Sequence, residues 1–517
     1  MRATSTSSSR RRPPDGPAAL LAAALLLFVL AGARVLGDYG PNIDAPKNWA
    51  EGRANLGVLL GRTPDPATAR EQLHGAPVFM LAELSRAIFS DRLGLLDPVS
   101  ARHALLIPLN AAFAVFLFLF ARRHWGGWTA LLAALALLSF PEYFGFSFNN
   151  LKDVPLVVLF SLAVMKGAER RTRRDLYVFH ALLGAALCVK MYALLVPAIL
   201  LARRDRKPLG TAAGGALTLG LVLAFYAPAW WATPDKRALL ASWFGHASAV
   251  SVNPKGGWNL ASFQQLAWKC PLWMLACAAA GTWTSLRRAR KDPQDALLIS
   301  WFFLPMLLPC LPGVYPYFPG LRLVLVACVP LAILAARGAF QLAEAAARRA
   351  PKQLRALRLA AGLGLVAANV CALSATHPYQ TLYYNFLAGG LGVAQAKGIP
   401  WSFDYWLNSY REAGRWLDAN AAPDAEVWEA YDAAIPERFK GLLRYSVSRR
   451  DLRIRYKDFS KEAPATLPPN TYLVFVPFSW YREEQRVLEG NVRAGRLERA
   501  LEITRSGGEI ATIYRRP

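Results

Sequence analysis

Long apolar runs recur along most of this chain, and they limit its fold more than any other feature. Runs of about 15–22 residues return between Ala18 and Thr376, each long enough to form a buried or membrane-spanning helix. Hydrophobic residues make up 54% of the 517 residues, which is too apolar for one soluble domain. We predict a mostly α-helical, polytopic transmembrane bundle of about eleven spans. The expected spans are 18–36, 104–121, 128–141, 155–168, 176–188, 190–202, 210–230, 264–285, 295–311, 321–338 and 356–375.

Arginine clusters fall in every second gap between these runs and predict the orientation. The positive-inside rule places such loops in the cytoplasm, facing anionic headgroups. The net charge of +25 therefore argues for membrane contact and against nucleic-acid binding. With the N-terminus inside, residues 37–103, 142–154, 231–263, 312–320 and the chain after 375 lie outside. The alanine- and arginine-rich composition is typical of a GC-rich bacterial genome, so we expect a multi-pass protein of the bacterial cytoplasmic (inner) membrane.

The two ends of the chain differ in character from the bundle. Residues 1–17 are expected to form a disordered cytoplasmic tail. The basic cluster Arg10–Arg12 followed by an apolar stretch also resembles a cleavable signal peptide, so cleavage of the first span stays open. Residues 18–375 form the expected transmembrane domain, and residues 376–517 an outward-facing soluble α/β domain. Its expected strands are Glu426–Tyr431, Leu452–Tyr456, Tyr472–Pro477 and Glu509–Tyr514.

The cysteines give no sign of a disulfide framework or a metal site. All six lie in or beside apolar runs, and the C-terminal region has none. No Cys/His spacing resembles a zinc site. We assign no metal ligand and no certain cofactor, and leave a divalent cation open.

Two acidic motifs lie in the gaps that the arginine clusters avoid. The first is Asp38-Tyr39-Gly40-Pro41-Asn42-Ile43-Asp44, just after the first span. The second is Asn149-Asn150-Leu151-Lys152-Asp153-Val154-Pro155, after the third span. Carboxylates at one membrane surface indicate chemistry at the lipid–water boundary, because a transport path more often places ionisable groups inside the spans.

These motifs resemble those of the polytopic C-type glycosyltransferases, and above all glycosyltransferase family 39. That family includes the protein O-mannosyltransferases and the lipid A aminoarabinose transferases. Bacterial members often carry an Asp-Glu pair in the first outer loop and an Asn-Pro-Lys-Asp-Ile-Pro-like string in the second. This chain departs from the pattern at Ala45, which stands where Glu is common, and at Leu151, which replaces Pro. Further similar strings are His74-Gly75, Arg102-His103, Gly320-Leu321-Arg322, His377-Pro378-Tyr379-Gln380, Tyr384-Asn385 and Asp404-Tyr405-Trp406.

The resemblance implies a C-type glycosyltransferase fold with catalytic outer loops at 37–103 and 142–154. It implies transfer of a sugar from a polyprenyl phosphate to an acceptor at the outer surface, with inversion. Such chemistry needs a base for the acceptor hydroxyl and cations where charge builds on the phosphate. We favour Asp44 as the base and take Asp38 as a weaker, substrate-binding candidate. The alternative is that Asp44 only caps a helix that starts at Pro46.

Asp153 is the second catalytic candidate, since it could orient the acceptor or help to hold a divalent cation. It could equally cap the span that begins at Val154-Pro155. Lys152 beside it is a candidate phosphate contact, or a side chain that only reaches the headgroups. Lys190 and Arg322 are also expected at the phosphate, because lone cations at the ends of apolar runs are costly; headgroup pairing is the alternative. His74 and His103 are further substrate-binding candidates in the outer loop.

The predicted partners are a polyprenyl-phosphate sugar donor, membrane lipids and an acceptor that is a glycan, lipid or protein. A transporter or flippase for a lipid-linked sugar is the main alternative function. A third possibility is a scaffold whose bundle only anchors the outer domain.

Overall fold

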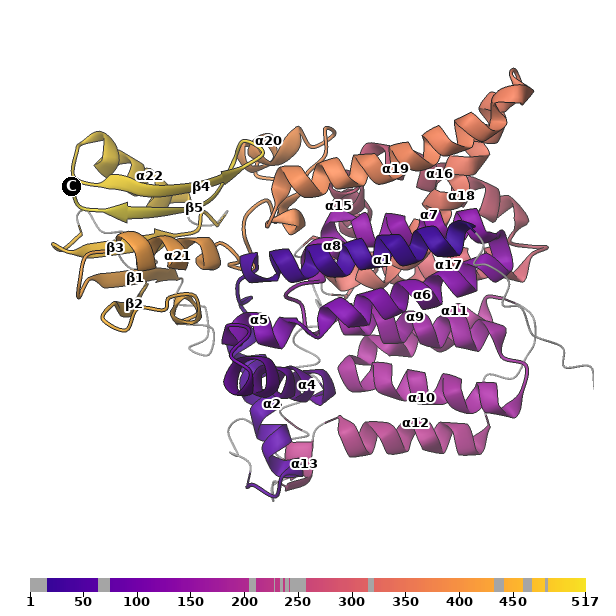
Figure 1. Ribbon diagram of the computed structural model, residues 1–517, viewed down its shortest axis with the longest axis horizontal. Coiled ribbons are helices and arrows are strands. Elements are labelled where there is room, and N and C mark those ends of the chain that lie inside the picture. The colour runs from indigo at the N-terminus through magenta and orange to yellow at the C-terminus, as the bar shows by residue number, and fades with distance from the viewer. Residues whose placement is uncertain are drawn as a thin grey trace, which may run out of the picture.

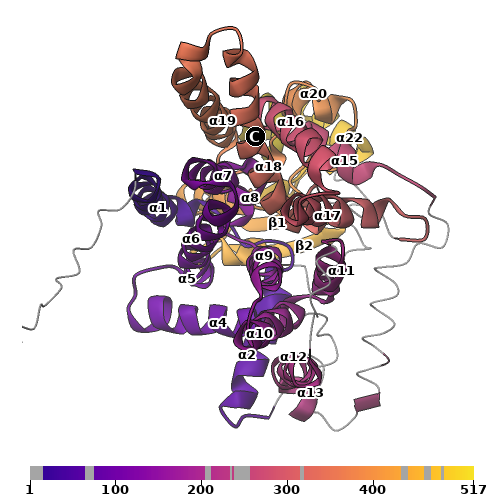
Figure 2. The same ribbon diagram turned by 90° about the vertical axis from the view of Figure 1, so that its right-hand side faces the viewer.

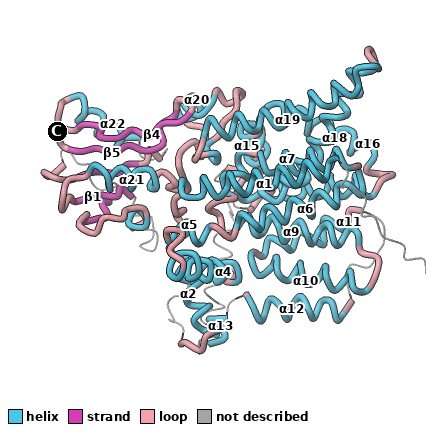
Figure 3. The backbone as a smooth tube through the Cα atoms, in the orientation of Figure 1, coloured by secondary structure: helices cyan, strands magenta, loops and turns pink. Residues whose placement is uncertain are grey.

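The computed structural model describes eleven stretches of the chain, which together form a helical bundle with a sheet-containing unit at one end (Figure 1). The described residues are 16–63, 75–203, 211–226, 228–232, 236–237, 241, 257–314, 320–431, 441–458, 467–478 and 482–517. The predicted fold class, a mostly helical transmembrane bundle followed by an α/β unit, is confirmed. The tube drawing separates the two parts clearly, with all strands in the C-terminal unit (Figure 3).

Among the described residues, five helical stretches are long and apolar enough to cross a membrane. They are Gly16–Asp38, Pro98–Trp125, Pro293–Cys310, Arg322–Ala347 and Pro351–Thr376. Three shorter apolar helices, Gly127–Ser139, Met191–Leu201 and Ala212–Phe225, lie among them. The chain is therefore a multi-pass membrane protein, while the larger number of about eleven spans stays a prediction.

The bundle is built from helices that mostly follow the predicted apolar runs, and Figure 2 shows many of these helices close to end-on. Its longer elements are α1 (Gly16–Val35), α6 (Leu106–Trp125), α7 (Gly127–Ser139), α9 (Asp153–Glu169), α10 (Arg173–Val189), α11 (Leu195–Leu201), α12 (Ala212–Phe225), α16 (Leu272–Arg288), α17 (Pro293–Leu307), α18 (Cys328–Ala347) and α19 (Leu354–Thr376). The shorter elements between them are η1 (Leu36–Asp38), α2 (Ala45–Leu59), α4 (Pro77–Arg86), η2 (Ala87–Arg92), α5 (Pro98–His103), α8 (Pro141–Phe146), η3 (Met191–Leu194), α13 (Pro228–Ala232), α15 (Ala261–Lys269), η4 (Leu308–Cys310), η5 (Arg322–Ala327) and η7 (Gln380–Leu382). A further turn, η6 (Pro351–Gln353), precedes α19.

Helix α18 forms the centre of the bundle, because most of its residues are buried on every side. Its closest neighbour is α16, where small residues bring the two backbones together. A Cβ on Gly338 would lie 1.8 Å from the Cys277 carbonyl oxygen, and one on Gly281 would lie 2.0 Å from that of Leu334. Close packing of this kind is typical of helix pairs in membranes, where van der Waals contact rather than water exclusion drives association.

One predicted span is interrupted. The apolar run 264–285 was expected to be one helix, but the structure divides it into α15 and α16 at Cys270 and Pro271. Proline lacks the backbone N–H that a continuous helix would need there. Helix α15 therefore ends before α16 begins, and Lys269, the last residue of α15, is buried in the interior.

The C-terminal unit contains one five-stranded mixed sheet in the order β2-β1-β3-β5-β4. Strand β1 is central to a parallel trio, and β5 pairs antiparallel with both β3 and β4. A separate hydrophobic core lies between this sheet and its helices. The elements are α20 (Gly390–Ala396), α21 (Tyr410–Asn420), β1 (Glu426–Tyr431), η9 (Leu443–Tyr445), β2 (Arg453–Asp458), β3 (Thr471–Phe475), α22 (Arg482–Arg493), β4 (Glu498–Arg505) and β5 (Gly508–Arg515).

Candidate active site

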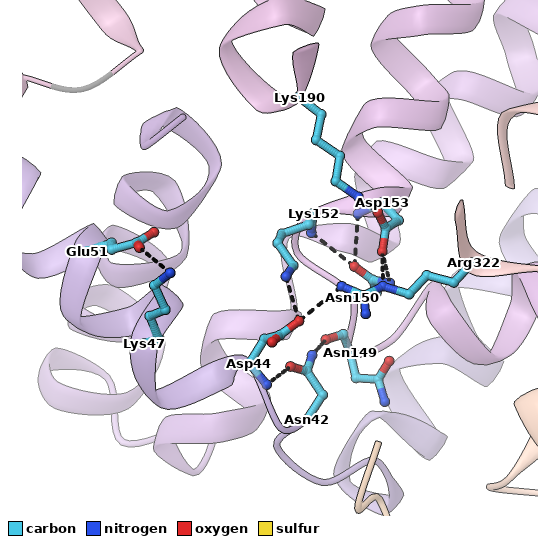
Figure 4. Close-up of polar contacts among 10 residues, drawn as sticks. All are labelled: Asn42, Asp44, Lys47, Glu51, Asn149, Asn150, Lys152, Asp153, Lys190 and Arg322. Atoms are coloured by element: carbon cyan, nitrogen blue, oxygen red, sulfur yellow. Dashed lines mark hydrogen bonds and ion pairs between the residues drawn. The ribbon is translucent and has the colours of Figure 1, made fainter. Parts of the chain in front are cut away.

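Four chain segments bring charged side chains together at the end of the bundle that faces the sheet (Figures 1 and 4). Asp44 immediately precedes α2, and Lys152 and Asp153 lie at the start of α9. Lys190 occupies the junction between α10 and η3, and Arg322 opens η5 before α18. All five residues were singled out in the sequence, and their side chains form one connected network.

Asp44 is held by two cations from distant segments. Its Oδ2 atom lies 2.5 Å from Lys152 Nζ and 3.0 Å from Arg322 Nη2. Although Asp44 occupies the N-cap position of α2, its side chain makes no capping hydrogen bond. The carboxylate therefore points into the ion network rather than back onto the helix that it precedes.

Asp153 forms the second centre of the network. Its Oδ1 atom lies 2.5 Å from Lys190 Nζ, and its Oδ2 atom accepts a hydrogen bond from Arg322 Nε at 2.8 Å. The Nδ2 atom of Asn150 donates to the same Oδ2 at 2.9 Å. Asp153 is the first residue of α9, but its carboxylate is bound to cations and not to the free N–H groups of that helix. Arg322 thus bridges both acidic motifs.

Asparagines from the same motifs fix the backbone around the two carboxylates. Asn150 Oδ1 accepts hydrogen bonds from the N–H groups of Lys152 and Asp153, at 3.1 and 2.9 Å. Asn42 Oδ1 accepts from the Asp44 N–H at 3.0 Å, and its Nδ2 donates to the Asn149 carbonyl at 2.6 Å. These Asx turns tie the first motif directly to the second. Both asparagines lie inside the acidic motifs, but hydropathy and charge alone do not predict these hydrogen bonds.

The cations exceed the acids in this network, since three of them surround two carboxylates. Lys152, Lys190 and Arg322 are mostly buried, with side chains 6, 16 and 10% exposed. Burial lowers the pKa of the Lys152 ammonium to about 8, although the Asp44 carboxylate opposes this effect. An excess of positive charge in a poorly solvated place suits a phosphate that carries developing negative charge. The buried ion pairs also show that Lys152 does not simply extend to the headgroups.

A buried ion pair between Glu142 and Lys269 lies next to Arg322, and no motif in the sequence predicts it. Glu142 of α8 accepts a hydrogen bond from the Leu321 N–H at 3.1 Å and pairs with Lys269 Nζ at 3.3 Å. Lys269 also donates to the Thr381 carbonyl. A small cavity of about 10 Å³ adjoins this pair, and Gly320 and Trp406 contribute to its lining. The Arg322 guanidinium lies over the Trp406 indole, with Cζ 4.2 Å from the ring centroid.

Two of the other predicted site residues lie in different surroundings. Asp38 pairs with His377 Nε2 and with Arg415 Nη1, each at 3.1 Å, where α1 and α19 meet α21. His103 is fully buried in α5, and among the described residues neither ring nitrogen has a hydrogen-bond partner. The structure therefore does not bring Asp38 or His103 into the network around Asp44. His74 lies outside the described residues.

A further carboxylate near Asp44 was missed in the sequence. Glu51 lies two turns along α2 from Asp44 and is 2% exposed. Burial raises its pKa to about 7, while Lys47 and Lys152 oppose the rise. Among the described residues, no group of three or more His, Cys, Asp or Glu side chains is arranged to hold a metal ion. The Asp44 and Asp153 carboxylates are bound to Lys and Arg side chains instead.

The sequence and the fold of this chain are similar to those of known proteins. Residues 80–231 match the family described as dolichyl-phosphate-mannose-protein mannosyltransferase. No curated protein sequence matches the chain. The fold is similar to the crystal structure of ArnT from Cupriavidus metallidurans bound to undecaprenyl phosphate, with 13% identity, a TM-score of 0.53, and coverage of 96% of this chain and 97% of that chain. The apo state of the same ArnT gives 14% identity, a TM-score of 0.53, and coverage of 95% and 98%.

The structural matches cover at least 95% of this chain, whereas the family match covers residues 80–231. They agree with the resemblance that the acidic motifs indicated. At this level of identity the structural likeness concerns the fold. The chain is therefore a polytopic membrane protein with a fold similar to that of ArnT, and its residues 80–231 are similar to the protein mannosyltransferase family, in agreement with a likeness to glycosyltransferase family 39.

Proposed function

We propose that this protein is a membrane glycosyltransferase that moves a sugar from a polyprenyl-phosphate donor to an acceptor hydroxyl, with inversion. The observation that carries the proposal is the network of Lys152, Lys190 and Arg322 around the Asp44 and Asp153 carboxylates. The network combines cations that can bind the donor phosphate with a carboxylate that can accept the proton of the acceptor hydroxyl. The undecaprenyl phosphate bound to ArnT, a protein of similar fold, supports a lipid-phosphate donor here.

In the proposed reaction, the acceptor oxygen attacks the anomeric carbon from the face opposite the phosphate. The bond between the anomeric carbon and the phosphate oxygen breaks, and its electron pair leaves with the polyprenyl phosphate. Asp44 takes the proton of the acceptor hydroxyl as this oxygen loses charge to the new bond. Lys152, Lys190 and Arg322 stabilise the departing phosphate in a place where water screens their charge poorly.

Asp153 has a positioning role in this mechanism. It binds Lys190 through Oδ1 and Arg322 through Oδ2, and so sets the distance between two side chains that would bind the phosphate. Glu142 acts one step further away, through its hydrogen bond to the Leu321 N–H. Preorganised cations of this kind reduce the reorganisation that the reaction would otherwise require.

We place the reaction at the outer surface of the bacterial cytoplasmic membrane, with the N-terminus inside. On this proposal, residues 1–17 are a cytoplasmic tail, 18–375 the transmembrane domain with catalytic outer loops 37–103 and 142–154, and 376–517 an extracytoplasmic domain. The supporting observation is that the charged network and its second motif contact the segment leading into the sheet unit, because Arg322 lies over Trp406 and Asn149 Nδ2 donates to Asn408 Oδ1.

The test uses purified protein in lipid vesicles, a panel of polyprenyl-phosphate sugars and a cell-envelope extract as acceptor. We expect release of free polyprenyl phosphate together with transfer of the sugar to the extract. No release from any donor by folded protein would contradict the proposal. Counterflow of labelled lipid across the vesicles without any acceptor would instead identify a flippase.

A further inference from the structure

Glu51 is a buried carboxylate with unused capacity to accept hydrogen bonds. Among the described residues, neither of its oxygens accepts one. Its ion-pair partner is Lys47 on the preceding turn of α2, with Nζ 3.5 Å from Oε1. Buried carboxylates normally receive several hydrogen bonds, because these offset the cost of leaving water. A group that donates hydrogen bonds would therefore find an unoccupied acceptor at this position.

The position of Glu51 relates it directly to Asp44. Asp44, Lys47 and Glu51 follow one another at intervals of three and four residues, which places them along one face of α2. In Figure 4, Glu51 and Lys47 lie on one side of Asp44, and Asp153, Lys190 and Arg322 lie on the other. Two of the cations suited to a donor phosphate, Lys190 and Arg322, are thus separated from Glu51 by the carboxylate proposed as the base, while the third, Lys152, acts on Glu51 as well.

We propose that Glu51 is an acceptor-binding residue, which accepts a hydrogen bond from the acceptor and so positions the reacting hydroxyl against Asp44. This inference rests on the proposed function and adds the chemistry of the second substrate. The ligand class is a neutral polyhydroxylated group such as a sugar ring, because a carboxylate would repel an anionic one.

The charged groups that act on Glu51 are few. Lys47 is on its own helix, and Lys152 and Asp44 belong to the network. Helix α13, which packs on α2, contains no charged residue within its bounds Pro228–Ala232. The raised pKa of Glu51, about 7, means that it becomes a full carboxylate as the pH rises through neutrality.

Helix α4 also packs on α2, and its acid is already paired. Glu83 binds Arg102 through Oε1 at 2.6 Å and Arg86 through Oε2 at 3.0 Å, and it lies 3.6 Å from Arg53 Nη1. Glu83 is therefore saturated by cations, in contrast to Glu51. This contrast makes Glu51 the acid of the α2–α4 pair that can take a ligand.

The experiment measures donor and acceptor KM separately for wild type and Glu51→Gln. The probes are the polyprenyl-phosphate sugar that wild type uses and a titrated cell-envelope extract. We expect the apparent acceptor KM to rise about tenfold, because glutamine is a weaker hydrogen-bond acceptor than carboxylate, with the donor KM changed less than about twofold. Glu483→Gln makes the same chemical change at an exposed position of α22 and should match wild type.

The outcomes separate this inference from the function on which it rests. A wild-type acceptor KM in folded Glu51→Gln, with transfer intact, would overturn the role of Glu51 and leave the proposed function standing. No transfer by wild type from any donor would overturn the proposed function itself. If Glu51→Gln does not fold, Lys47→Gln decides the question. The acceptor KM is expected to change with pH as Glu51 titrates. Without the Lys47 cation this change should occur at a higher pH. An unchanged pH profile would overturn the inference.

Discussion

The Arg322 guanidinium lies 4.2 Å from the ring centroid of Trp406, so an aromatic side chain from beyond the last span supports a cation of the ion network. Arg322 also binds Asp44 and Asp153, which come from the two acidic motifs. One side chain therefore connects three parts of the chain that are far apart in sequence. Substitutions that change the contacts of Arg322 should therefore affect donor binding.

Trp406→Ala should weaken donor binding by about tenfold, because it removes a partly desolvated cation–π contact and frees the Arg322 side chain. Trp406→Phe should retain part of the effect. The measurement is the affinity of purified protein for polyprenyl phosphate. Trp283→Ala is the matched control, since Arg287 lies over that exposed indole at 4.5 Å on α16. Equal affinities for Trp406→Ala and wild type would contradict the role given to this contact.

Glu142→Ala should destabilise the folded protein by about 3 kcal/mol or more, because it leaves Lys269 buried without its carboxylate. The double variant Glu142→Leu with Lys269→Met should recover much of this loss. Thermal unfolding in detergent measures both. Glu169→Ala removes an acid that pairs with Arg123 near the surface, and its effect should stay within about 1 kcal/mol. A Glu142→Ala protein as stable as wild type would show that the pair is not structural.

Donor kcat/KM should fall as the pH rises through about 8, because Lys152 then loses its positive charge in the free enzyme. The lowered pKa means that the cation is fully present only below this pH. Lys152→Arg keeps the charge at all these pH values, so its profile should lack this alkaline fall. A pH–rate profile of both proteins is sufficient. The same fall in Lys152→Arg would exclude Lys152 as its origin.

Glu429 in strand β1 should make the C-terminal unit less stable as the pH rises. Burial raises its pKa to about 7, although the N–H groups of Leu443 and Gly441 donate to its carboxylate. Between the ordinary value of 4.5 and about 7 the folded state binds more protons than the unfolded state, so stability falls with rising pH. The shift corresponds to about 3 kcal/mol.

Hydrogen exchange of the amides in β1 and β3, corrected for its intrinsic pH dependence, measures this effect. Glu429→Gln should abolish the loss of protection between pH 5 and 8. Glu498→Gln changes an exposed acid in β4 and should leave the pH dependence as in wild type. A pH-dependent loss that persists in Glu429→Gln would assign it to another group.

The sequence predicted much of the ion network because one physical constraint connected its parts. Cations and acids at the ends of apolar runs avoid the hydrocarbon, and the arginine pattern placed Asp44, Asp153, Lys190 and Arg322 on one side of the membrane. Convergence at one surface was therefore expected, although the individual pairs were not. These pairs depend on backbone turns set by Asn42 and Asn150, whose hydrogen bonds leave no trace in hydropathy.

Other features were hidden because they depend on contacts between distant residues. Asp38 was a reasonable substrate ligand by position, yet His377, 339 residues away, binds it. The buried acids Glu142 and Glu51 look like ordinary polar residues of a loop and a helix. Strand β4 was missed because its sequence, Glu498–Arg505, alternates charged and apolar residues imperfectly and is interrupted by bulges against β5.

The most direct test of the proposed chemistry compares Asp44→Asn with Asp91→Asn in lipid vesicles. Asp91 is an exposed acid of the same predicted outer loop, 37–103, and pairs with Arg86. We expect Asp44→Asn to slow release of polyprenyl phosphate at least about a hundredfold, as loss of a general base does, while its affinity for polyprenyl phosphate is kept or increased. Asp91→Asn should behave like wild type. Near-normal turnover by folded Asp44→Asn would contradict the assignment of Asp44 as the base.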